Sequence, residues 1–224
     1  MFMKTLPLQF REGHIFVEID GALWLVDTGA PTSFGPSKSV MFAGKQFSLE
    51  SGYLNLTATS LSEFVGVACV GLLGGDVLGG FDHLFDVPGG KLVVSSAELS
   101  HEGERVSMDA FMGIPIVEVR INGRIYRMFF DTGAQISYFQ DSSLGTFPPA
   151  GRVDDFYPGV GAFSTETHDV PIALGGTSFR LRCGSLPGIL GMTLMVAGTQ
   201  GIVGNAIFSD RVVGYFPRRS VLVL

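Results

Sequence analysis

The sequence is poor in charged residues, in cysteine and in long apolar runs, and each shortage excludes a class of protein. Charged residues make up only 16% of the 224 positions and form no basic cluster, so nothing indicates nucleic-acid binding. The two cysteines, Cys69 and Cys183, are too few for a disulfide framework, and apolar neighbours predict buried free thiols. No uncharged run approaches the roughly 18 apolar residues of a membrane span.

Metal-ligand spacing and secretory signals are also missing. The four histidines show no ligand pattern, and no long apolar stretch follows Lys4. We therefore expect a cytoplasmic protein that needs no metal or cofactor and has neither nucleic acid nor membrane as a partner. The net charge of −6 is mild and selects no substrate.

Glycine, by contrast, is abundant, with 31 residues. Short apolar runs separated by turn residues are typical of β proteins, and no helical periodicity is long enough for a helical bundle. A hydrophobic content of 46% allows a substantial core in one large domain or two small ones. The composition therefore favours an all-β fold.

A repeat divides the chain into two halves. Residues 25–34 read LVDTGAPTSF and residues 129–138 read FFDTGAQISY, so Asp-Thr-Gly-Ala, a serine and an aromatic residue recur at matching places. Upstream of each copy, alternating apolar and polar residues lead to Asp20-Gly21 or Asn122-Gly123, which are strong hairpin signals. Each half is therefore expected to feed the second strand of a hairpin directly into Asp-Thr-Gly.

The repeat continues downstream. Leu72-Leu73-Gly74 and Ile202-Val203-Gly204 each precede a turn and a closing apolar strand. A competing motif, residues 189–191, fits less well, because its distance to the closing strand does not match the first half. A polar, turn-like stretch separates the copies, which predicts an N-terminal lobe of residues 1–99 and a C-terminal lobe of residues 100–224.

The chemistry of the repeat lies in its two aspartates. Asp27 and Asp131 both follow strongly apolar strands, which a surface turn does not need but a carboxylate in a dry cleft does. If the halves pack about a pseudo-twofold axis, the two carboxylates face each other and share one proton, because like charges so close cannot both ionise easily. One can then act as general base on a water and the other as general acid toward a carbonyl oxygen.

The flanking residues suit the same site. Gly29 and Gly133 let the backbone come close enough for amide groups to reach the carboxylates. Thr28 and Thr132 carry hydroxyls that can tie one loop to the other across the axis. We therefore interpret these four residues, with the two aspartates, as the candidate catalytic group.

These motifs together resemble the retropepsin and pepsin clan of aspartic proteases. Ala30 and Ala134, after the glycines, are similar to the retroviral type, whereas pepsins usually have serine there. Retropepsins assemble their site from two chains, but this chain carries both halves, so it resembles a single-chain, fused retropepsin-like protease. The resemblance implies a bilobal pseudo-twofold fold and hydrolysis of peptide or protein substrates. We expect a monomer; self-association that covers the open side of the cleft is the alternative.

Such proteases close a glycine-rich hairpin, the flap, over the substrate. From the aspartate to the later glycine the first half has 47 residues and the second has 73. The extra length contains Gly159 and Gly161, which suit a hairpin tip, and Tyr157, which could lean over the aspartates. We therefore predict one flap, from the second half, and only a short hairpin around residues 50–52 in the first.

A second interpretation uses the same fold without catalysis. The missing first flap is also compatible with a catalytically inactive peptide-binding or scaffold module, because a fold does not guarantee an activity. Retention of both aspartates with their threonines and glycines argues for the protease.

Overall fold

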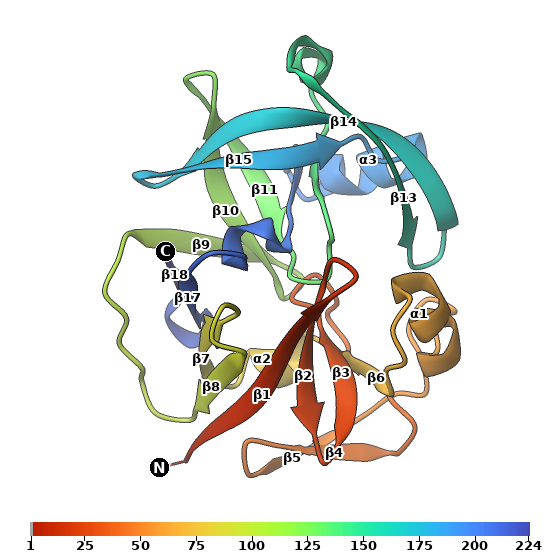
Figure 1. The fold of residues 1–224 in the computed structure, drawn as a ribbon, viewed down its shortest axis with the longest axis vertical. Helices are drawn as coiled ribbons and strands as arrows, with labels where there is room; N and C mark the ends of the chain where they lie inside the picture. The colour runs from red at the N-terminus through yellow and green to blue at the C-terminus, as the bar shows by residue number, and fades with distance from the viewer. Residues whose placement is uncertain (1) are drawn as a thin grey trace.

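The computed structural model describes residues 2–224 and is built mainly from β-strands (Figure 1). The first half contains β1 (Met3–Arg11), β2 (His14–Ile19), β3 (Ala22–Val26), β4 (Ser39–Phe42), β5 (Lys45–Ser48), α1 (Ala58–Val65), β6 (Gly71–Leu73), α2 (Gly75–Leu78), β7 (Asp82–Asp86) and β8 (Lys91–Ser95). The second half contains β9 (Arg105–Phe111), β10 (Ile114–Ile121), β11 (Arg124–Phe130), β12 (Ser137–Phe139), η1 (Ser142–Thr146), β13 (Pro149–Tyr157), β14 (Gly161–Leu174), β15 (Thr177–Gly184), α3 (Gly188–Val196), β16 (Gly201–Val203), η2 (Asn205–Phe208), β17 (Val212–Phe216), η3 (Pro217–Arg219) and β18 (Val221–Val223). None of the helices within the described residues has both the length and the apolar character that crossing a bilayer requires.

Each half repeats one strand arrangement. In the first, β1, β2 and β3 form an antiparallel meander and β3 pairs in parallel with β6; in the second, β9, β10, β11 and β16 do the same. Both predicted hairpin turns are present, with φ of 50° and 79° at Asp20-Gly21 and of 48° and 79° at Asn122-Gly123. Positive φ at both central residues matches the twist of the flanking strands.

The parallel pairs identify the equivalent glycine motif of the second half. Phe130 pairs with Val203 as Val26 pairs with Leu73, whereas residues 189–191 lie within α3. The choice of the Ile202-Val203-Gly204 motif is confirmed.

The two halves share one continuous ladder of strands. β17 of the second half pairs with β7 of the first, and β8 continues the order to β1 (Figure 1). Next to this join, the fully buried Asp82 accepts hydrogen bonds from Arg218 at 2.8 Å, from Arg219, and from the Leu99 amide at 2.9 Å. Removing one partner of such a buried ion pair leaves an uncompensated charge, so this contact strongly favours one arrangement of the halves.

The predicted boundary between the lobes lies in a segment without strands. β8 ends at Ser95 and β9 begins at Arg105. The division into residues 1–99 and 100–224 stays a prediction.

The core is continuous beneath the join. Phe208 contacts both Phe85 of the first half and Phe130 of the second, with ring centroids 5.2 and 5.8 Å apart. Cys69 and Cys183 are free and buried, as the sequence predicted.

The short hairpin expected around residues 50–52 is not formed, and this prediction was wrong. β5 pairs instead with β4 through a turn at Ala43-Gly44, where φ is 46° and 77°. Tyr53 and Leu56 form only an isolated bridge before α1 begins. The turn was missed because alanine, its first central residue, is a weak turn signal. Gly52 is a stronger signal and led to a turn being predicted at residues 50–52.

A titratable side chain lies deep in this shared core. His83 is fully buried between the rings of Phe85 and Tyr215, and its Nε2 lies 2.8 Å from the carbonyl oxygen of Leu78. Burial disfavours the charged imidazolium and lowers the pKa of His83 to about 4. The neutral ring therefore stabilises the fold above the ordinary histidine pKa, and this stability is lost as the pH falls toward 4.

We expect His83→Gln to weaken the dependence of stability on acid. Between pH 7 and pH 4 the wild type should lose roughly 3 kcal/mol more unfolding free energy than the variant, because only the wild type has to protonate a buried ring. Urea unfolding at both pH values measures this difference. Equal losses in the two proteins would contradict it.

Candidate active site

Two aspartates leave equivalent strand ends and meet between the halves. Asp27 follows β3 and its amide donates to Leu73 O at 3.0 Å, and Asp131 follows β11 and donates to Val203 O at 3.0 Å. Each carboxyl group lies against the glycine of the opposite loop, and the charge of Asp131 acts on Asp27. The strand pairing of each half thus fixes one carboxyl group of the pair.

Two threonines bind the aspartate loops together. The amide of Thr28 donates to Thr132 Oγ1 at 3.0 Å, and the amide of Thr132 donates to Thr28 Oγ1 at 3.1 Å. Each hydroxyl also donates across the axis, Thr28 to Phe130 O at 2.8 Å and Thr132 to Val26 O at 2.7 Å. Both threonines are 0% exposed, so all four bonds lie away from solvent.

The glycines leave room for the opposite carboxylate. A Cβ on Gly29 would lie 2.3 Å from an Asp131 oxygen, and one on Gly133 would lie 2.5 Å from Asp27 Cγ. The amides of Gly29 and Gly133 each donate at 2.8 Å to the aspartate of their own loop. Any larger residue at either position would push the pair apart.

The environment favours protonation of the pair. Burial raises the pKa of Asp27 well above its ordinary value, and the neighbouring Asp131 raises it further. Burial also raises the pKa of Asp131, although hydrogen bonds from Asp27 and from loop amides oppose this shift. The geometry therefore suits two carboxyl groups that hold one proton between them, titrating as a unit.

The pair lies in a cleft of about 380 Å³ with largely apolar walls. The hairpin of β13 and β14 contributes Tyr157 and Gly159 to its lining, and the Val160 amide closes the tip by donating to Tyr157 O at 3.0 Å. Gly161 is not part of the lining; it begins β14, with φ of 91°. Two of the three predicted flap residues therefore reach the cleft.

The first half supplies a helix on its side of the cleft. Thr57 and Ser60 form a capping box that starts α1, and Leu61 of α1 lines the cleft. Phe64 of α1 stacks on Phe156 of β13, with centroids 4.6 Å apart and an interplanar angle of 11°. The hairpin of the second half thus rests on a helix of the first.

The sequence did not indicate a further link between the halves. His14, at the β1–β2 turn, is buried and its Nδ1 lies 3.1 Å from Gly133 O. From the other side, Asn205 donates to Gly13 O at 2.7 Å and to Thr132 O at 3.3 Å. The position of Asn205 directly after the repeated glycine was the one available signal, whereas nothing in the spacing of His14 pointed to the site.

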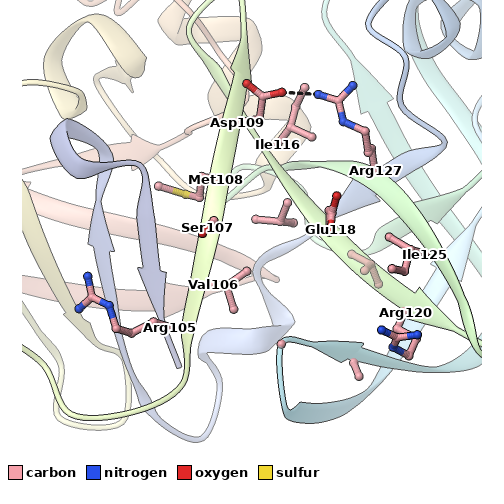
Figure 2. Close-up of a pocket in the computed structure, with 14 residues that line it drawn as sticks. Arg105, Val106, Ser107, Met108, Asp109, Ile116, Glu118, Arg120, Ile125 and Arg127 are labelled. Atoms are coloured by element: carbon pink, nitrogen blue, oxygen red, sulfur yellow. Dashed lines mark hydrogen bonds and ion pairs between the residues drawn. The ribbon is translucent and has the colours of Figure 1, made fainter.

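A second hollow, of about 460 Å³, lies on the face of β9, β10 and β11 (Figure 2). It is lined by several charged side chains, among them Arg105, Arg120 and the ion pair of Arg127 with Asp109. Neither aspartate of the pair borders it, so it is separate from the candidate active site. No group of three or more metal-ligating side chains gathers anywhere in residues 2–224.

Comparison with known proteins supports the fold. No protein-family model matches the sequence, and no curated protein matches it. Among solved structures, the chain is similar to an aspartic proteinase from Irpex lacteus, with a TM-score of 0.50 and 11% identity over 98% of this chain and 96% of that one. At so low an identity the likeness establishes the fold alone. The predicted all-β, bilobal aspartic-protease fold is confirmed.

We expect Thr28→Val to destabilise the protein by roughly 2–4 kcal/mol. The substitution keeps the shape but removes two buried hydrogen bonds and leaves the Thr132 amide without an acceptor. Urea unfolding measures the loss. Thr146→Val is a matched control, because Thr146 is exposed and should change stability by no more than about 0.5 kcal/mol. A similar small effect at both positions would contradict the interpretation.

Proposed function

We propose that the protein is an aspartic endopeptidase, with Asp27 and Asp131 as its catalytic residues. The observation that carries this proposal is the pair of half-buried carboxyl groups, each set against the glycine of the opposite loop and braced by Thr28 and Thr132, at an apolar cleft. A structural role alone would not require two acids with raised pKa values side by side.

The proposed reaction needs only these two groups and a water. The ionised carboxylate removes a proton from a water, whose oxygen adds to the carbonyl carbon of the substrate. The protonated partner donates to the carbonyl oxygen. The C–N bond of the tetrahedral intermediate then breaks; the leaving amine takes a proton from the pair, and a hydroxyl of the intermediate returns one, so the pair again holds one proton. Because both pKa values are raised, the singly protonated pair should persist to higher pH than two ordinary aspartates allow.

The substrate in this proposal is an extended peptide segment. The β13–β14 hairpin covers the cleft, and its backbone can bind an extended chain as an added strand. Tyr157 and Gly159 are the proposed substrate-binding residues of this flap; Gly161 is proposed to give the hairpin its freedom to move rather than to contact substrate.

We further propose the single-chain, retropepsin-like type. One chain supplies both aspartate loops, and Ala30 and Ala134 follow their glycines as in the retroviral pattern. A cytoplasmic, monomeric enzyme that acts on peptides or proteins without a cofactor remains our prediction.

We expect the wild type to cleave members of a diverse peptide library between pH 4 and 7, and Asp131→Asn to reduce the rate at least about 10³-fold. The asparagine keeps the shape but can neither share the proton nor act as the base. Mass spectrometry of the digests measures cleavage and identifies the sites cut.

Asp109→Asn is the control, because Asp109 is exposed in the separate hollow. Cleavage that survives in both Asp27→Asn and Asp131→Asn would rule out the pair. If the wild type cleaves nothing but binds peptides, the inactive binding module is the better interpretation.

The stack of Phe64 on Phe156 predicts a second effect, on the flap. We expect Phe64→Ala to lower kcat/KM by roughly 3- to 10-fold, because the closed flap loses an aromatic contact worth about 0.5–1.5 kcal/mol. Steady-state kinetics on one library substrate measures this. Phe10→Ala is a matched control, since Phe10 is equally exposed, at 44% against 43%, and has no aromatic partner among residues 2–224. Equal effects of the two substitutions would contradict a role for the stack.

A further inference from the structure

The cleft contains one charged side chain besides the aspartate pair. Among the residues that line it, Asp155 is the third acid, and no lysine, arginine or histidine lines it. The rest of the lining is mainly leucine, phenylalanine, tyrosine and other uncharged residues. A substrate in this cleft therefore meets a negative charge and no positive one.

Asp155 is held in a fixed position. It is half-buried on β13, between Val153 and Tyr157, which both pack on the core of the second half. Alternate residues of a strand share a face, so Asp155 points to the same side as these two. The hydroxyl of the buried Tyr138 donates to its Oδ2, and the Phe156 amide donates to Oδ1 at 2.8 Å.

The charge of Asp155 is not neutralised within residues 2–224. No lysine or arginine forms an ion pair with it there. The charge of Asp155 acts on His14, but burial is the larger effect and lowers the pKa of that imidazole, so the ring is neutral at pH 7. A carboxylate has about four acceptor sites, so its two hydrogen bonds leave room for a further donor.

Asp155 also lies close to the reaction centre. Asp155 and Tyr157 line the same cleft as the aspartate pair. Burial and then the charges of the pair raise the pKa of Tyr157 to about 12, in keeping with this position. Asp155 precedes it by two positions on the same face, a separation of about 7 Å. The same 7 Å separates alternate side chains of an extended substrate, so Asp155 faces a substrate position within about two residues of the scissile bond.

We propose that Asp155 is a specificity residue that selects a substrate with a lysine or arginine side chain within two residues of the cleaved bond. This inference rests on the proposed function and narrows its substrate class. Covering a half-buried carboxylate with an apolar side chain removes water without replacing its hydrogen bonds, whereas an ammonium or guanidinium group replaces them. The apolar walls strengthen the attraction, because they lower the local dielectric.

The test compares peptides that differ by one amino group. A fluorogenic peptide cut by the wild type is remade with lysine or with norleucine at each of the two positions on either side of the scissile bond. At one of these positions we expect kcat/KM at pH 6 to be at least about tenfold higher for lysine. Asp155→Asn should bring this lysine-to-norleucine ratio close to one, and Asp155→Lys should favour glutamate over lysine.

Asp154→Asn is the matched control. Asp154 is exposed on the opposite face of the same strand and is hydrogen-bonded to Ser164, so its loss should leave the ratio unchanged. A ratio within one enzyme does not depend on how much of each variant is folded. If Asp155→Asn cleaves neither peptide, two other results decide the inference: the lysine-to-norleucine ratio of the wild type, and the preference of Asp155→Lys for glutamate over lysine.

Failure of the inference differs from failure of the proposed function. A wild-type ratio of one or less at every position overturns the role of Asp155 while cleavage of the norleucine peptides upholds the protease. If no library peptide is cleaved, the protease is overturned, and a library peptide that binds the wild type is remade with lysine or norleucine at each position in turn; the affinities, measured by fluorescence anisotropy, then decide whether Asp155 selects a basic side chain. Tighter binding of lysine, by about tenfold, supports it, and equal binding overturns it.

Discussion

The mutual hydrogen bonding of Thr28 and Thr132 is the interaction on which the rest of the site depends. Each hydroxyl accepts a hydrogen bond from the amide of the opposite threonine and donates one to a carbonyl at the end of the opposite half's strand, Phe130 in β11 or Val26 in β3. Neither loop can therefore move alone. This cross-link holds two acids together that would otherwise separate to keep their hydration. Holding the two acids together costs free energy, and other contacts between the halves offset this cost. These are the pairing of β17 with β7 and the ion pairs of the buried Asp82 with Arg218 and Arg219.

In the proposed protease, the same interaction keeps the aspartate loops independent of the hairpin that covers them. Buried hydrogen bonds fix the two loops, whereas the β13–β14 hairpin rests on the first half through the stack of Phe156 on Phe64. In the proposed protease, such a hairpin can open for substrate without disturbing the carboxyl pair, because the bonds between the loops do not involve it. When the hairpin is closed it excludes water from the cleft and lowers the dielectric around the two aspartates. Charge interactions at the pair are then stronger than in an open cleft.

Much of this could be predicted from sequence because the repeat is local. Two copies of Asp-Thr-Gly, each after a hairpin with a strong turn signal, specify the strand order and bring Asp27 and Asp131 to equivalent ends. Some contacts could not be predicted because they join residues far apart in the chain, such as His14 with Gly133. No short pattern encodes them, since they depend on how the halves pack. The β4–β5 hairpin was missed because its turn residues, Ala43-Gly44, are not a strong turn signal.

The single hairpin over the cleft has a consequence for direction. A peptide has an amino end and a carboxyl end, and a site with perfect twofold symmetry treats both orientations alike. Here one wall is the β13–β14 hairpin, which carries Asp155, and the other includes Leu61 of helix α1. A peptide and its reversed orientation therefore meet different surroundings in this cleft, so the site itself possesses a polarity. Placing both halves in one chain frees each copy to diverge, and that divergence can encode the order in which a substrate's residues are read.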